Sequence, residues 1–200
     1  DKLNLAYGII LPPSTSETRI QPCTLAITLL SLLNVTILSP IDPSSLPLLR
    51  SLHLSYQTCQ PIRLLLLKIA SLHLRYVRLN SDIDDLIQQS SSINSLSICE
   101  DYIPRVNEAS RTAIKEKIVK LRLQFTEDGY SSDSTVAAII AGSKVMKKVI
   151  LDGVNLSVAD QVKPQILETL KVVKEACKKK EIELWRENFD VENGMVDLEK

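Results

Sequence analysis

Apolar residues recur along most of the chain in the pattern apolar-x-x-apolar-x-apolar. Side chains of an extended strand point alternately to opposite faces, so the last two apolar residues of each unit share one face. The pattern therefore predicts one strand per unit, with neighbouring strands parallel and paired in chain order. The expected strands lie near residues 33–37, 51–55, 71–75, 95–99, 120–124, 148–152 and 182–185. The units are Leu30, Leu33 and Val35; Leu49, Leu52 and Leu54; Ile69, Leu72 and Leu74; Ile93, Leu96 and Ile98; Ile118, Leu121 and Leu123; Met146, Val149 and Leu151; and a shortened last unit, Ile182 and Leu184.

The spacing of these units is graded. Successive units are 19, 20, 24, 25, 28 and 33 residues apart, close to the roughly 20 to 29 residues of leucine-rich repeats. A unit of this length cannot bury its apolar face alone, whereas a stack of units can. The spacing thus predicts an α/β fold: a leucine-rich-repeat solenoid with parallel strands on a concave face and helices or turns on the other. The residues expected to form one ladder in its core are Leu52, Leu72, Leu96, Leu121 and Val149.

Three of the connecting segments are expected to be helical. Ser81 or Asp82 can cap the first helix, and Asp133 or Ser134 can cap the second, which Gly142 would end. The longest helix is expected within 157–180. Residues at helical spacing that should face the core are Ile83, Leu86, Ile87, Val136, Ile139, Ile140, Ile166, Leu170, Val173 and Cys177. The chain then divides into an N-terminal loop or partial repeat (1–29), a repeat array (30–185) and an acidic C-terminal tail (186–200).

Composition narrows the classes of partner. Of the 200 residues, 44% are hydrophobic, which suffices for a continuous core, and 24 basic residues balance 24 acidic ones. Because no broad basic surface follows from this balance, we expect no nucleic acid as partner. The apolar runs 24–38 and 62–72 are too short to span a bilayer, so no membrane association is expected.

The four cysteines point to an intracellular location. Cys23, Cys59, Cys99 and Cys177 are separated by 36, 40 and 78 residues, which suits neither a zinc pair nor a compact disulfide framework. We expect buried free thiols in a reducing compartment. No basic segment precedes an apolar one as in a signal peptide, so we expect a cytoplasmic or nuclear protein.

Three stretches resemble a known family. They are "LHLRYVRLNSDIDDLIQQSSSINSLSI", "VAAIIAGSKVMKKVIL" and "LKVVKEACKKKEIELWRENFD". They look like the degenerate leucine-rich repeats that follow the F-box in plant and fungal F-box proteins, although no F-box is visible in these 200 residues. The resemblance implies the substrate-recognition part of a ubiquitin ligase receptor, with a Skp-type adaptor as partner if an F-box lies upstream. The alternative is a leucine-rich-repeat scaffold or sensor, such as an immune-receptor tail, without a ligase role.

Few residues suggest catalysis. His53 and His73 occupy equivalent positions of neighbouring strands and should lie side by side on the face opposite the core. A metal pair or a general base is conceivable there, but no carboxylate or cysteine shares their register, so a repeated surface position is favoured. Asp82, Asp84 and Asp85 resemble the start of a calcium loop without its Gly and closing Glu, and an acidic helix start is favoured. No nucleotide-binding or nucleophile-elbow motif occurs. We expect no enzyme, no cofactor and no metal.

The alternation of side chains along each strand predicts which residues form the binding surface. Residues that alternate with the core positions should point to the concave face and bind a protein partner. They are His53, His73, Arg75, Ser97, Lys120, Arg122, Lys148 and Ile150, with Gln124 beside them. The middle of this row is weakly basic, which favours a partner with an acidic centre. Trp185 is either an exposed anchor at the end of the array or a lid over its terminal core, and the second interpretation is favoured.

Overall fold

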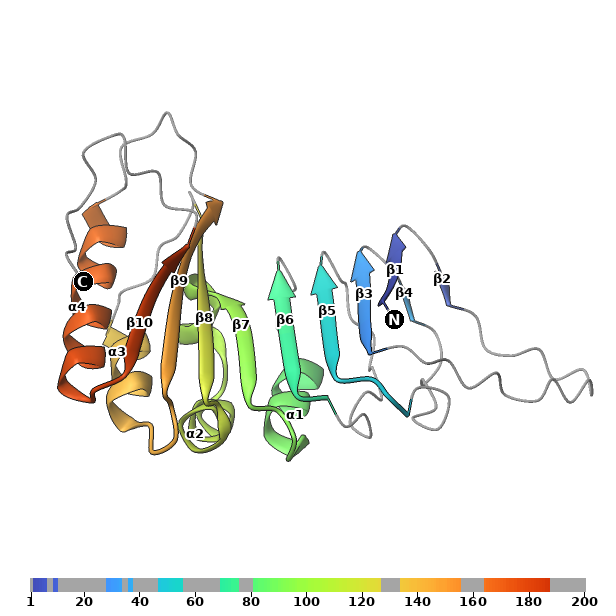
Figure 1. Ribbon diagram of the computed structural model, residues 1–200, viewed down its shortest axis with the longest axis horizontal. Helices are drawn as coiled ribbons and strands as arrows, with labels where there is room; N and C mark the ends of the chain where they lie inside the picture. Colours follow the sequence, from blue (N-terminus) through green and yellow to red (C-terminus); the bar gives the residue numbers. More distant parts are fainter. Residues whose placement is uncertain are drawn as a thin grey trace, which may run out of the picture.

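The main sheet is parallel throughout. In the computed structural model, the described residues are 2–6, 9–10, 28–33, 36–37, 47–55, 69–75, 81–126, 134–155 and 164–187. Eight strands form one open sheet in chain order (Figure 1), and each pairs in parallel with its neighbour. They are β1 (Lys2–Ala6), β3 (Leu29–Leu33), β5 (Ser51–Ser55), β6 (Ser71–Arg75), β7 (Ser95–Cys99), β8 (Lys120–Thr126), β9 (Lys148–Asn155) and β10 (Glu183–Glu187). Strands β2 (Ile9–Ile10) and β4 (Thr36–Ile37) form a separate pair. The expected parallel pairing in chain order is confirmed.

The expected core ladder is also confirmed. Leu52, Leu72, Leu96, Leu121 and Val149 are register partners on successive strands, and each is 0% exposed. Full burial of such a side chain contributes roughly 1.5 to 3 kcal/mol to folding. Parallel pairing in one register repeats this gain from strand to strand and holds the sheet together.

The predicted register is wrong at both ends of the array. Leu30, not Leu33, pairs with Leu52 in the first unit, because this phase places Ser31 on the polar face beside His53. In the last unit, Leu184 pairs with Val149. Ile182 instead completes the turn after the preceding helix, where its N–H donates to the carbonyl of Cys177 over 2.9 Å.

The described helices pack on the same face of the sheet as this ladder. They are α1 (Ser81–Gln89), α2 (Glu108–Lys117), α3 (Ser134–Gly142) and α4 (Pro164–Lys179), with a 3-10 helix η2 (Glu100–Arg105) before α2. The residues that join the strand leucines in one core are Leu86, Ile87, Ala113, Ile114, Val136, Ile139, Ile140, Leu170, Val173 and Cys177. Helices α1, α3 and α4 were expected. Two more expected core residues, Ile83 and Ile166, lie in α1 and α4, but their side chains are not among those that the structure describes.

Helix α2 was not predicted, although its start is well defined. Asn107 caps it, since its Oδ1 accepts a hydrogen bond of 2.8 Å from the backbone N–H of Ser110. Asp84 of α1 accepts hydrogen bonds from Asn107 N–H and Ser110 Oγ. Asp84 therefore joins two neighbouring helices, in keeping with the favoured interpretation of the acidic segment as a helix start.

The ends of the chain and the cysteines complete this description. Strand β1 shows that 1–29, expected as a loop or partial repeat, adds a strand to the sheet, and β10 extends to Glu187, inside the expected tail. Cys99 and Cys177 are buried free thiols, as expected, and burial raises the pKa of Cys177 to about 12. Cys23 and Cys59 lie outside the described residues. Among the described helices, none combines the length and the apolar character needed to cross a membrane.

Candidate functional site

The side of the main sheet opposite the helices is here called the open face. Its middle row is His53, His73, Ser97, Arg122, Ile150 and Trp185, which are register partners from β5 to β10. Strand alternation also puts Arg75, Lys120, Lys148 and Gln124 on this face. All the residues expected at the binding surface thus lie on one face. No helix of the described ranges packs there.

The two histidines stack on each other. The ring centroids of His53 and His73 are 4.8 Å apart, with 29° between the ring planes. Burial, followed by the nearby His53, Arg122 and Arg75, lowers the pKa of His73 from 6.5 to about 4, against a smaller opposing effect of Asp152. His73 is therefore neutral at neutral pH. A base whose conjugate acid has so low a pKa is a weak proton acceptor, which argues against the general-base alternative.

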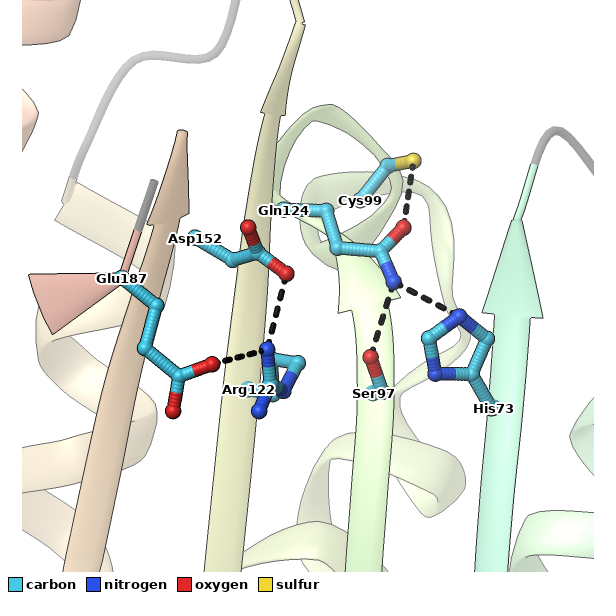
Figure 2. A network of polar contacts seen from close by, with 7 residues as sticks. All are labelled: His73, Ser97, Cys99, Arg122, Gln124, Asp152 and Glu187. Carbon is cyan, nitrogen blue, oxygen red and sulfur yellow. Dashed lines mark hydrogen bonds and ion pairs between the residues drawn. The ribbon is translucent and has the colours of Figure 1, made fainter. Parts of the chain in front are cut away.

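Gln124 organises the centre of the open face. This side chain is 2% exposed and reaches from β8 across β7 toward β6 (Figure 2). Its Nε2 donates to Ser97 Oγ over 2.9 Å and to His73 Nε2 over 3.0 Å, and its Oε1 accepts from Cys99 Sγ at 3.7 Å. Since His73 Nε2 accepts, the ring proton sits on Nδ1. Ser97 lies on the expected face but is only 7% exposed, so it is not the open surface residue that was predicted.

Arg122 is neutralised by two carboxylates. Its Nη1 lies 2.8 Å from Asp152 Oδ2 and 2.7 Å from Glu187 Oε2 (Figure 2). Burial alone would lower the pKa of Arg122, but the hydrogen bonds to these carboxylates raise it. The expected basic centre of the face is therefore wrong, because its main cation is already paired. The ion pair of Glu187 with Arg122 was not predicted, because Glu187 lies opposite Asp152 only in the register that pairs Leu184 with Val149.

The end of the open face carries an exposed aromatic ring. Trp185 is 47% exposed, and Lys148 Nζ lies 3.4 Å from its ring centroid, a cation–π contact. Trp185 is thus an exposed residue of the open face, and the favoured interpretation as a lid over the terminal core is wrong. Its register partner Ile150 is 1% exposed, so the prediction that Ile150 points into solvent is also wrong.

Among the described side chains, no group of three or more His, Cys, Asp or Glu residues is placed to hold a metal ion. No protein-family model, curated protein or solved structure matches this chain. Its function is therefore inferred from its own geometry and charge.

Proposed function

We propose that this chain is a leucine-rich-repeat solenoid that recognises another protein on its open face. The observation that carries the proposal is the register of the parallel strands, which aligns equivalent positions into rows along a face free of described helices. Such a surface can vary in its outward residues while the buried leucines keep the scaffold intact. The repeat spacing supports the leucine-rich-repeat assignment.

Only part of the open face is accessible to a partner protein. Toward the carboxyl ends of the strands, Gln124 and Asp152 are buried, and their hydrogen bonds go to Ser97 and Arg122. Partly exposed polar residues begin the strands, with Ser51, Ser71 and Ser95 in register and Lys120 next in the row. The partner is therefore proposed to contact the amino-terminal half of the strands and the exposed ring of Trp185. This area combines hydroxyl donors with one aromatic anchor, a mixture common at protein interfaces.

The more specific proposal is a substrate receptor of an F-box-type ubiquitin ligase, which rests on the sequence resemblance alone. In that case a Skp-type adaptor binds an F-box outside these 200 residues, and the chain itself is not an enzyme. Co-precipitation of a Skp-type adaptor with the full-length protein supports this role. A full-length protein without an F-box favours the scaffold or sensor role instead.

A blocking substitution tests open-face recognition. Ser71→Arg adds a long side chain at the start of β6, and Thr112→Arg adds the same side chain to the exposed surface of α2. Affinity capture from the cells of origin with wild type and both variants, followed by titration calorimetry with the purified captured protein, compares the two surfaces. We expect Ser71→Arg to weaken binding at least about tenfold and Thr112→Arg to leave it unchanged. Loss with Thr112→Arg alone contradicts the proposal.

A further inference from the structure

Lysines crowd the edge of the molecule where β8, β9 and β10 begin. Three segments meet there, 115–120, 143–148 and 177–183, each joining the end of a helix to the start of the next strand. Backbone hydrogen bonds tie them together, from Lys144 N to Lys115 O (3.2 Å), from Lys147 N to Val119 O (2.9 Å) and from Glu183 N to Lys147 O (3.0 Å). In Figure 1 they form the lower edge of the sheet. This edge is called the lysine rim.

The lysine rim departs strongly from the charge balance of the whole chain. It holds nine lysines and three glutamates, a net charge of +6, although the net charge of the chain is 0. The lysines are Lys115, Lys117, Lys120, Lys144, Lys147, Lys148, Lys178, Lys179 and Lys180, and the glutamates are Glu116, Glu181 and Glu183. None of these lysines forms an ion pair with an acidic side chain in the part of the chain that the structure describes. Within the described ranges, the rim therefore keeps an excess of positive charge.

Helix ends account for only some of these charges. Lysines in the last turn of a helix interact favourably with its dipole, which explains those that end α2 and α4. Lys120 and Lys148, in contrast, begin adjacent strands and are direct register partners. Like charges directly opposite each other destabilise a sheet, and only Glu183, next in that row, offsets them. Folding alone does not favour this pair.

We propose that the lysine rim, which adjoins the open face and shares Lys120 and Trp185 with it, binds an acidic polypeptide segment. Lys120, Lys144 and Lys147 are exposed and free to meet carboxylates. Trp185 stands beside Lys148 with half its surface exposed and offers a flat apolar contact to a side chain between those carboxylates. Separate carboxylates can be spaced around Glu181 and Glu183. The backbone of a nucleic acid carries a phosphate at every nucleotide, so some phosphates would lie next to these two acids and be repelled. The rim also offers lysines, whereas arginines bind phosphate through two hydrogen bonds at once. A peptide is therefore favoured over nucleic acid.

The chain's single tryptophan gives a direct binding signal. A glutamate-rich peptide carrying one leucine is titrated into the full chain while Trp185 fluorescence is followed. A glutamine-rich peptide of equal length and a single-stranded oligonucleotide serve as comparison probes. We expect saturable binding of the acidic peptide that weakens with added salt, and no binding of the glutamine-rich peptide. Tighter binding of the oligonucleotide than of the acidic peptide overturns the proposal.

Two variants of equal charge change locate the site. Lys144→Glu with Lys147→Glu alters the rim, and Arg105→Glu with Lys171→Glu makes the same change at exposed positions away from it. The rim variant is expected to bind the acidic peptide about tenfold more weakly and the control variant less than about threefold more weakly, since exposed charge pairs are individually weak. Equal loss in both variants, or none in the rim variant, overturns the proposal. Open-face recognition is tested separately by Ser71→Arg, which leaves every rim lysine in place.

Discussion

His73 links the polar network of the open face to the stability of the fold. Its pKa is about 4 in the folded chain and 6.5 in the unfolded chain, because burial and nearby cations disfavour the charged ring. Above the unfolded pKa, both states hold a neutral ring and the group contributes nothing. As the pH falls through 6.5 toward 4, the unfolded state takes up the proton first, so the stability of the folded state falls.

The size of the effect follows from the two pKa values. Once the pH has fallen to the pKa of His73 in the folded chain, the titration of this ring has lowered the unfolding free energy by about 3 kcal/mol. Between pH 7 and pH 5 the part due to His73 is about 2 kcal/mol. His73→Gln removes the titration, so its unfolding free energy should fall by about 2 kcal/mol less than that of the wild type over this range. Carboxylate titrations occur in both proteins and cancel in the comparison.

Urea unfolding at a series of pH values measures this difference. Because the chain holds only two histidines, NMR titration of their ring signals in the folded protein, assigned with the variant, gives the pKa directly. A His73 midpoint near 6.5, or equal pH slopes for the wild type and His73→Gln, would refute the buried neutral ring and the hydrogen bond it accepts from Gln124.

Three further predictions concern the scaffold, all measured by chemical unfolding. Leu96→Ala should lower the unfolding free energy by about 2 to 5 kcal/mol, since Leu96 is 0% exposed within the core ladder; a loss below about 0.5 kcal/mol contradicts its burial. Asn107→Ala should cost about 0.5 to 2 kcal/mol by removing the cap of α2, whereas Asn94→Ala, at an exposed position outside a helix start, should cost less. Glu181→Gly should raise stability by about 1 kcal/mol, because Glu181 holds a φ of 57° after α4, where glycine is unstrained; unchanged or lower stability argues against that strain.

Much of the sheet could be predicted because one physical signal repeats. Each central unit places two apolar residues on one side of a strand. In a unit such as Leu72 and Leu74, only one choice of which strand face points to the core buries both residues. The leucine-rich first unit offers two phases, and the choice depends on Ser31 pairing beside His53, which a local pattern does not show. Helix α2 was missed because its signal is one capping residue, Asn107, rather than a long apolar face.

The face of the site was predictable, whereas its exposure was not. Alternation along the strands fixes which residues share a face, and those expected there do so. Burial of Ser97 and Ile150, and neutralisation of Arg122, depend on side chains from neighbouring strands. These contacts require the register of β9 and β10 to be correct to the residue, and the last unit was assigned two residues too early.

Site-specific photo-cross-linking in the cells of origin tests open-face recognition most directly. A photoreactive amino acid replaces Ser71 on the open face in one protein and Thr112 on α2 in another, and cross-linked products are identified by mass spectrometry. Recognition by the open face predicts one protein partner that cross-links from position 71, disappears with Trp185→Ala, and does not cross-link from position 112. Products formed only from position 112, or none from position 71, would contradict it.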